Sequence, residues 1–507
     1  MRLILALILL SPGLLSANHH AAAPDPGAVG EVALPTTGSP DAQPWFLHGL
    51  AQLHNFEYGD AADYFREAQA RDPAFALAYW GEAMTHNHPI WMQQDRDAAL
   101  SILRRLAPTP EARVARAGSP LERDLLGAVE VLYGEGDKTS RDVAYRDRMA
   151  ALHRKYADSA DVGAFYALAL LGTAHGGRDF AIYMQSAAIT EQLFERHPRH
   201  PGVAHYLIHA TDDPVHAPLG LRAAKAYAAI APNAAHAQHM TSHIFLALGL
   251  WDATALANDT AVSVVNRSRE ARGQQSVGCG HYPSWQMYAY LQLGRKADAA
   301  ARMRLCHART AGARPDAQQA RGFYYMKSLY LVDSDDWSGE IASLEIPDTG
   351  GASGAFEKAY LDAMIALNVS AERARPSVQA VRTAYNTLLA DIEPSRNRGE
   401  AIPGPNGTAL LQVRMHLLEA RLAETLGKVE AAEGHLRDAV TLEAGLPFGF
   451  GPPNPAKPAL EALAELQLRL GQSDAGRASF ESALARMPNR TRSVQGLARA
   501  RSAVSQQ

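Results

Sequence analysis

The strongest constraint on the fold is a spacing of aromatic, small and proline residues that is typical of two closely packed antiparallel helices. Near the N-terminal end the residues with this spacing are Trp45, Gly49, Ala61, Phe65, Ala68 and Pro73. Small residues let the two helices approach, the phenylalanine ring fills the remaining gap, and the proline suits the first turn of the next helix. The sequence therefore predicts a helical hairpin that begins at residue 45.

The same spacing returns near the C-terminal end of the chain. One copy contains Ala420, Ala432, Leu436 and Ala439, and a second contains Ala464, Gly476, Phe480, Ala483 and Pro488. The segment 445–458 between them is rich in Gly, Pro and Phe, and its apolar content predicts that this inserted loop packs on the rest of the molecule, over a groove. The polar, Arg-rich segment 490–504 is typical of a helix that caps a repeat array.

The middle of the chain carries a weaker version of the pattern. We expect helix pairs near 74–105, 120–156, 160–196, 201–231, 234–270, 283–310, 317–345 and 355–390. Helix starts or breaks are expected at Pro110, Pro120, Pro201, Pro218 and Pro376. Because Ala is abundant and runs of Val, Ile and Thr are rare, helices are favoured throughout. The sequence predicts one all-α solenoid over 45–507, with about ten or eleven helix pairs.

These motifs resemble the tetratricopeptide repeat (TPR) superfamily, whose repeat is 34 residues long. The resemblance rests on specific motifs at both ends of the chain and on the period alone in the middle. The central segments HYLIHATDDPVHAPLG and HMTSHIF also look like those of a poorly characterised group of exported bacterial His-rich TPR-like proteins. The superfamily implies a right-handed superhelix in which the first helix of each pair lines a concave groove. That groove usually binds a peptide or protein partner, and the resemblance implies no activity.

The N-terminal end has the features of an export signal. Arg2 precedes the apolar run 3–10, and small residues follow at Ser16 and Ala17. We interpret 1–17 as a signal peptide and 18–44 as a flexible leader, which predicts a periplasmic or secreted protein with no membrane span after cleavage. The alternative is an uncleaved N-terminal anchor.

Charge and cysteine content narrow the function further. The formal net charge is −4 and the Lys and Arg residues form no block, which excludes a nucleic-acid or anionic-membrane binder. The only two cysteines, Cys279 and Cys306, lie at the adjacent ends of helices predicted over 283–293 and 295–309. In an oxidising compartment this predicts a disulfide. The alternative is that both thiols, with neighbouring histidines, bind a metal.

The segment 201–245 holds six of the twenty histidines and is the clearest chemical signal. Two of its histidines, His205 and His209, are four residues apart, and so are His239 and His243. Such pairs share one helix face, and the two pairs are offset by 34 residues, the TPR period. Equivalent groove-lining helices of adjacent repeats would then bring the four imidazoles to one metal ion.

Further residues near this segment are candidates for additional ligands or for groups that orient the ligands. They are His216, His236, Asp212, Asp213, His281, Glu82 and His86, with His175, His88 and Tyr79 as weaker possibilities. His281 is a candidate because the segment 281–285 parallels 239–243 in the next repeat. Glu82 and His86 enter because a long superhelix can curl until its early repeats face its middle.

Imidazole-rich sites suit copper, zinc or iron, and export favours copper. Non-haem iron would require a carboxylate from Asp212 or Asp213. The sequence has no HExxH, GxSxG or P-loop motif and no zinc-type Cys pair. We therefore expect an exported metal-binding protein with a small-molecule or peptide ligand in the groove. If it is an enzyme, redox catalysis is favoured over hydrolysis. The alternatives are histidines used without metal for acid–base chemistry, a peptide-binding scaffold, and a metal storage or delivery protein.

Overall fold

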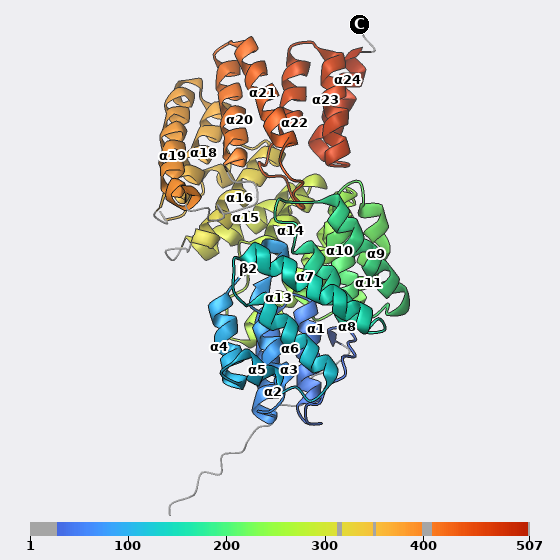
Figure 1. The fold of residues 1–507 in the computed structure, drawn as a ribbon. Helices are drawn as coiled ribbons and strands as arrows, with labels where there is room; N and C mark the ends of the chain where they lie inside the picture. Colours follow the sequence, from blue (N-terminus) through green and yellow to red (C-terminus); the bar gives the residue numbers. More distant parts are fainter. Residues whose placement is uncertain (1–27, 312–316, 348–350, 398–407, 505–507) are drawn as a thin grey trace, which may run out of the picture.

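The computed structural model describes residues 28–311, 317–347, 351–397 and 408–504. These residues form a solenoid of antiparallel helix pairs that rises from the N-terminal repeats to the C-terminal ones (Figure 1). The described residues contain 24 α-helices, which make eleven pairs, one short unpaired helix between residues 110 and 114, and an end helix. The predicted all-α, TPR-like solenoid and its number of helix pairs are confirmed.

The N-terminal elements are α1 (Gln43–His54), α2 (Tyr58–Arg71), α3 (Ala76–Met84), β1 (Asn87–His88), the 3₁₀ turn η2 (Pro89–Trp91), β2 (Gln93–Gln94), α4 (Arg96–Leu106), α5 (Pro110–Val114), α6 (Pro120–Leu132), α7 (Lys138–Lys155), α8 (Ala160–Leu171) and α9 (Phe180–Arg196). The central elements are α10 (Pro201–Thr211), α11 (Ala217–Ile230), α12 (Ala235–Ala247), α13 (Trp251–Ala271), α14 (His281–Gln292) and α15 (Lys296–Thr310). The C-terminal elements are α16 (Ala317–Ser334), α17 (Glu340–Ser343), α18 (Ala352–Val369), α19 (Ala371–Asn397), α20 (Ala409–Thr425), α21 (Val429–Ala444), α22 (Ala459–Arg469), α23 (Ser473–Arg486) and α24 (Thr491–Val504).

The first hairpin shows why the repeat requires small residues. The ring of Phe65 on α2 is fully buried and packs 5.6 Å, centroid to centroid, from the ring of Phe46 on α1. A Cβ added to Gly49 would lie 3.0 Å from the Phe65 ring, and one added to Gly81 would lie 2.4 Å from it. Only glycine on the neighbouring helices lets this ring fill the space between them.

The segment before α1 differs from the prediction. We expected 18–44 to be a flexible leader, but its described part packs against the solenoid, where Val29 and Leu34 are buried. The Glu31 amide donates to the carbonyl of Arg199, and the Thr37 side chain donates to a carboxylate oxygen of Glu122. An irregular segment lacks periodicity, yet it can bury apolar side chains and satisfy its backbone through such long-range bonds. The predicted signal peptide, 1–17, lies outside the described residues.

Two smaller differences concern local breaks in the helices. A short antiparallel hairpin, β1–β2, interrupts the pair predicted over 74–105, with Asn87 opposite Gln94. Pro376 lies inside α19, in its second turn, and neither starts nor breaks the helix. The other four prolines occupy the first or second position of α5, α6, α10 and α11, where a missing amide proton costs nothing.

The C-terminal repeats fold back onto the middle of the solenoid. The indole of Trp251 at the start of α13 donates to the carbonyl of Asn489. The buried guanidinium of Arg490 forms ion pairs with Asp333 and Glu461 and donates to the hydroxyl of Tyr288 on α14. Because a buried charge is stable only when it is paired, these contacts fix the C-terminal repeats on α13, α14 and α16.

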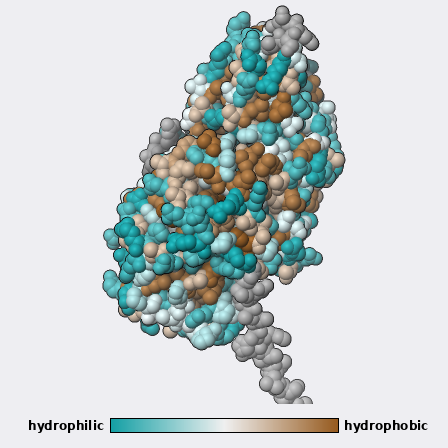
Figure 2. All heavy atoms as spheres, turned by 90° about the vertical axis from the view of Figure 1, so that its right-hand side faces the viewer, coloured by the Kyte–Doolittle hydropathy of each residue, from teal (hydrophilic) through white to brown (hydrophobic). Residues whose placement is uncertain are grey.

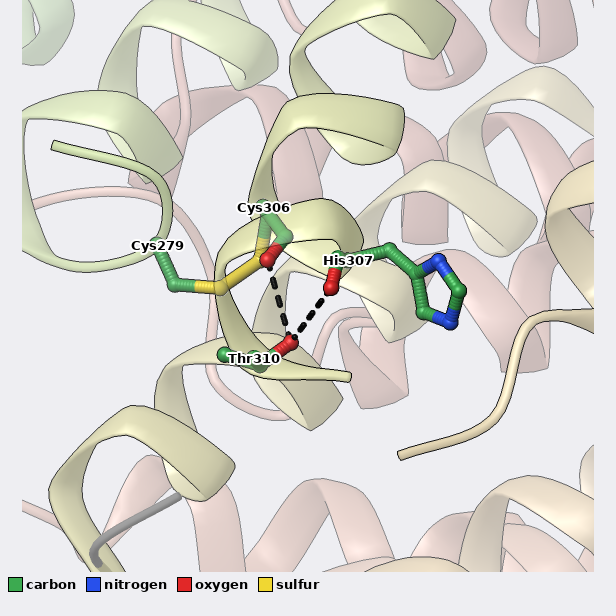
Figure 3. Close-up of a disulfide and its surroundings, with 4 residues drawn as sticks. All are labelled: Cys279, Cys306, His307 and Thr310. Carbon is green, nitrogen blue, oxygen red and sulfur yellow. Dashed lines mark hydrogen bonds between the residues drawn. A yellow bond between two sulfur atoms is a disulfide. The ribbon is translucent and has the colours of Figure 1, made fainter. Parts of the chain in front are cut away.

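The predicted disulfide between Cys279 and Cys306 is present (Figure 3). Cys306 lies in the last turns of α15, where Thr310 donates to the backbone carbonyls of Cys306 and His307. Cys279 comes two residues before His281, the first residue of α14. The disulfide therefore ties the start of α14 to the end of α15.

The surface turned towards the viewer in Figure 2 is mixed, with hydrophobic atoms gathered near its middle and hydrophilic atoms above and below. Within the part of the chain that the structure describes, no helix is both long enough and apolar enough to cross a membrane.

Candidate metal centre

Six imidazoles come together where three consecutive repeats meet. His205 and His209 come from α10, three more histidines come from α12, and His281 comes from α14. These helices are the first members of successive pairs, as the repeat register predicts. Residues four apart on a helix lie one turn apart on the same face, so the rings of His205 and His209 are 4.8 Å apart and those of His239 and His243 are 5.0 Å apart.

The six histidines divide into two groups of three. In the first triad, made by His205, His209 and His236, one ring nitrogen of each residue lies within 4.8 Å of the others. The second triad, defined by the same distance, is made by His239, His243 and His281. All but His281 are buried. The four histidines predicted to share one ion do not form a single such group among the described residues. His236 and His281 complete the triads, and by the same distance Asp212 groups with His209 and His243, one histidine from each triad.

In the second triad, hydrogen bonds determine where the ring protons lie. His239 Nδ1 is 2.7 Å from Oδ1 of Asn258, whose own amide donates to the carbonyl of Thr254. An amide oxygen only accepts, so His239 donates from Nδ1 and keeps a lone pair on Nε2. His243 Nδ1 is 2.8 Å from the carboxylate of Asp212. It also donates, which leaves a lone pair on its Nε2.

Asp212 is ionised because of its neighbour Arg178. Burial alone would raise the pKa of Asp212, but the Arg178 guanidinium and the hydrogen bond from His243 hold this pKa well below its usual value. Both residues of the ion pair are buried. The carboxylate therefore acts as a fixed acceptor that orients the imidazole of His243.

The Nε2 atoms of His239 and His243 face each other at 3.2 Å. Both carry lone pairs, which repel at this distance unless a positive centre lies beside them. In a tetrahedral site with metal–nitrogen distances of about 2.0–2.1 Å, two ligand nitrogens are about 3.3 Å apart. The separation fits two ligands of one ion.

The first triad is oriented by the end of α1. His205 Nδ1 is 2.7 Å from the backbone carbonyl of His54, the last residue of α1, and the carbonyls of a final helical turn lack intrahelical partners. His205 therefore donates from Nδ1. Its buried Nε2 has no hydrogen-bond partner among the described residues, and the same holds for Nε2 of His209 and His236. An unsatisfied buried polar group costs about 1–3 kcal/mol, so three in one triad indicate a ligand.

The start of α12 is also held from a distance. No side chain within α12 caps its first turn, but the Glu57 carboxylate accepts the backbone amide of His236 at 2.8 Å. Burial raises the pKa of Glu57 to about 7, although bonds from backbone amides oppose this shift. This hydrogen bond holds the first turn of α12 in place and positions His236 beside the other two histidines of the first triad.

Aromatic rings enclose both triads. Measured between ring centroids, Phe56 packs 4.3 Å from His205. Trp285 stacks 4.6 Å from His243, and Phe450 lies 5.1 Å from the same ring. Phe450 belongs to the loop 445–458, so this loop packs against the second triad. Phe56 has a left-handed backbone with φ of 57°, an uncommon conformation for an aromatic residue. The contact between Phe56 and His205 shows that early repeats reach the middle of the chain.

Burial keeps the imidazoles neutral. It lowers the pKa of His205, His236 and His239 well below the ordinary value, and neighbouring histidines lower these values further. The pKa of His243 is also lowered by burial, although Asp212 opposes the shift. Since a metal binds only the deprotonated imidazole, these rings are ready to bind a metal at neutral pH.

The other predicted residues lie outside the triads. Asp213 accepts from Arg178, His216 and two backbone amides, and it forms the turn after α10. His216 pairs with Asp213 rather than with the other histidines. Glu82 binds Gln69 and Arg105 within the N-terminal repeats.

Three more of the predicted residues are also placed elsewhere. His175 pairs with Asp142, His88 stacks on Tyr58, and Tyr79 donates to the carbonyl of Pro73. His86 is in none of the metal-ligand groups that the described residues form. Contacts between the early repeats and the centre come instead through the turn between α1 and α2, through the His54 carbonyl, Phe56 and Glu57.

Several orienting residues could not be found from the sequence. Asn258 and the His54 carbonyl accept from His239 and His205, which lie on other helices. Arg178 acts through Asp212, the acceptor of His243. Asn258 gives a weak signal, because an amide in the middle of an apolar helix face needs a partner.

A second buried cluster contains His54, Asp161 and His200, and we call it the Asp161 network. Both histidines lie with Nε2 3.1 Å from the same oxygen of Asp161. His54 Nδ1 is 3.0 Å from the hydroxyl of Tyr206, and His200 Nδ1 accepts the amide of Val203, which caps α10. All four ring nitrogens have partners. A third group, His416, His435 and Asp438 on α20 and α21, is partly exposed.

No known family model matches this chain, and no curated protein matches it in sequence. Solved structures with a similar fold include the APC/C hetero-tetramer Cut9–Hcn1, at 12% identity and a TM-score of 0.36, covering 93% of this chain and 78% of that one. Yeast Tom70 has 12% identity and a TM-score of 0.35, covering 92% and 96%. The TPR domain of P58(IPK) has 13% identity and a TM-score of 0.21, covering 92% and 99%.

Proposed function

We propose that this chain is an exported protein that binds a transition-metal ion at the histidine triads, with copper as the favoured metal. The observation that carries the proposal is the pair of Nε2 lone pairs on His239 and His243, 3.2 Å apart. Their Nδ1 atoms are fixed by Asn258 and Asp212. Orienting a ligand histidine through its second nitrogen is the usual arrangement around protein-bound metals.

The surroundings support metal binding over proton transfer. A histidine that exchanges protons in a reaction needs a pKa near the ambient pH. Burial lowers the pKa of His205, His236, His239 and His243, so at neutral pH these rings are uncharged and offer lone pairs. This is the protonation state that a metal requires.

The donors and charges favour copper. Imidazole nitrogen suits copper, zinc, iron and nickel. Non-haem iron would need a carboxylate ligand, but Asp212 is already engaged by Arg178 and His243. The charges of Asp212 and Arg178 also cancel, so a buried ion of low charge is the least costly. Copper(I) has a single charge, and copper supplies redox chemistry, which favours an oxidoreductase over a hydrolase.

Elemental analysis of the purified protein tests the proposal. We expect copper in the native protein, and uptake of copper by protein that has been stripped with a chelator. Exchanging His239 and His243 together for Ala should abolish uptake by the second triad and leave the helical content unchanged. The matched control exchanges His416 and His435, a histidine pair outside the triads, and should retain full uptake.

Two outcomes would contradict the proposal or limit it. A native protein that contains no metal and takes up neither copper, zinc nor iron would exclude a metal site. Copper that exchanges readily, without oxygen consumption in the presence of reductants or phenols, would indicate storage or delivery in place of catalysis.

A second candidate function is peptide binding by the C-terminal repeats. A pocket of about 290 Å³ lies among α16, α18, α20 and α22, where Trp337, Tyr360 and Met364 alternate with Arg469 and other charged side chains. Mixed apolar and charged walls suit an extended peptide. Peptide-array binding that is lost in Tyr360→Ala but kept in His239→Ala would assign this role to the pocket.

A further inference from the structure

We infer that the first triad holds a second ion, so that the protein binds two copper ions side by side, each with three imidazole ligands. This inference rests on the proposed function of the second triad. It adds a metal site formed by His205, His209 and His236.

The two triads are built in the same way. Each consists of an i, i+4 pair from one groove-lining helix and a third histidine from the first turn of the next such helix. His236 is the second residue of α12 and completes the pair on α10. His281 is the first residue of α14 and completes the pair on α12. One repeat step therefore converts one triad into the other, which predicts one ion for each triad.

The first triad carries its own evidence for an ion. The three Nε2 atoms of His205, His209 and His236 are buried and have no partner among the described residues. The proton of His205 is fixed on Nδ1 by the His54 carbonyl, so its Nε2 presents a lone pair. Phe56 and Tyr227 pack on the His205 ring, 4.3 Å and 5.5 Å away, and keep it in place.

The two triads are close enough to act as one centre. The rings of His209 and His243 are 5.6 Å apart, and those of His236 and His239 are 6.0 Å apart. One oxygen of Asp212 lies 2.8 Å from Nδ1 of His243 and 3.6 Å from Nδ1 of His209. A single carboxylate thus faces one histidine of each triad.

The charges around this centre decide which ions it can hold. An imidazole that binds a metal ion is neutral, so six such ligands and the Asp212–Arg178 ion pair contribute no net charge. Two divalent ions would bury four positive charges, whereas two copper(I) ions would bury two, and burying uncompensated charge is costly. Copper(I) is therefore the ion to use in a titration that measures how many metal ions each chain binds.

The experiment is anaerobic titration of the full-length, metal-free protein with copper(I), followed by desalting and measurement of copper per chain. We expect two copper ions in the native protein and one in either His236→Ala or His281→Ala. The variant with both exchanges should bind none, and the control His416→Ala should bind two. Far-UV circular dichroism checks that each variant is folded.

The outcomes separate this inference from the proposed function. One ion per native chain, lost in both His236→Ala and His281→Ala, would mean a single shared site and overturn the inference alone. No ion in the native chain would overturn both proposals. Loss of one ion in His416→Ala would place the second ion at α20 and α21 and also overturn the inference.

A measurement on the unaltered protein avoids any effect of the exchanges on folding. Crystals of the copper-loaded protein, measured at the copper absorption edge, should show two anomalous peaks. One peak should lie against the first triad and the other against the second. A single peak would overturn the inference.

Discussion

The two triads and the Asp161 network place buried histidines at similar distances, yet their hydrogen bonding is opposite. In the Asp161 network every ring nitrogen of His54 and His200 has a partner. In the first triad three Nε2 atoms have none among the described residues, and in the second two lone pairs face each other. Clustered histidine and carboxylate groups therefore do not identify a metal site by themselves. We propose that the distinguishing feature is a ring nitrogen left without a partner once the hydrogen bonds are assigned.

The two regions are also connected. The Asp161 network fixes the side chain of His54, and the backbone carbonyl of the same residue accepts from His205. One cluster thus holds the end of α1 in place and supplies an orienting group for the other. Each prediction below perturbs one side of this comparison, beginning with the largest expected effect.

Acid should destabilise the metal-free protein through both regions. Burial lowers the pKa of His54 to about 4, although its hydrogen bond with Asp161 opposes the shift. In the unfolded chain His54 binds a proton near pH 6.5. Its contribution to the free energy of unfolding is therefore fully present above that pH and is lost as the pH falls from about 6.5 to 4. Each such histidine contributes about 1.4 kcal/mol per pH unit in this window.

His205, His236, His239 and His243 also have lowered pKa values, so the combined slope should exceed that of any single residue. Urea unfolding of the metal-free protein at pH 8, 7, 6 and 5 measures it. We expect little change from pH 8 to 7 and a steep loss below 6.5. Stability that stays constant down to pH 5 would contradict the assignment of buried neutral histidines.

Asp161→Ala should destabilise the fold by about 3–5 kcal/mol, because it leaves two buried histidines without their shared acceptor. Chemical denaturation at pH 7 measures the loss. Asp158→Ala removes a fully exposed carboxylate nearby and serves as the control, with an expected effect within about 0.5 kcal/mol. Equal effects of the two exchanges would show that the Asp161 network is not structural.

Exchanging Cys279 and Cys306 together for Ser should lower the free energy of unfolding by about 3–4 kcal/mol, since the disulfide closes a loop with a sequence separation of 27. The start of α14 would also be freed, so copper affinity should fall at the second triad, through His281, and not at the first. Competition with a copper(I) chelator measures both affinities. Equal weakening of the two triads would contradict the local role of the disulfide.

Phe450→Ala should have the smallest effect. The exchange removes a ring packed 5.1 Å from His243, with an expected loss of about 1 kcal/mol and faster removal of copper by a chelator. Phe448→Ala, in the same loop, is the matched control, because no ring contact between Phe448 and a histidine occurs among the described residues. Identical copper release in the two variants would show that Phe450 does not cover the site.

The local parts of this structure could be predicted from the sequence. The hairpins, the disulfide and the shared face of each histidine pair follow from periodicity within a few turns of helix. The 34-residue offset placed α10 and α12 in register, because equivalent positions on stacked repeats face the same groove. His281 could be named as a candidate because 281–285 parallels 239–243, and His236 because it shares a helix with His239 and His243.

The division into two triads could not be predicted. It depends on the displacement of α12 and α14 relative to one another along their axes, which the sequence does not give. The same limit applies to Asn258, to the His54 carbonyl and to Phe56, whose contacts join segments distant in sequence. The part of the leader that the structure describes, 28–44, was wrongly predicted as flexible, since an irregular segment gives no periodic signal of the surface that it covers. The ion pair of Glu82 with Arg105 could not be predicted either, because Arg105 lies on a neighbouring helix.

The contacts of Arg490 also set an order of assembly for a chain synthesised from its N-terminus. All six imidazoles have been made once synthesis passes His281, long before the cover of the second triad exists. The loop 445–458 comes later, and the repeats that flank it are anchored only when Arg490 reaches Tyr288, Asp333 and Glu461. The ligands therefore come first and the cover last. The interval between them is a time in which a metal ion can enter an open site.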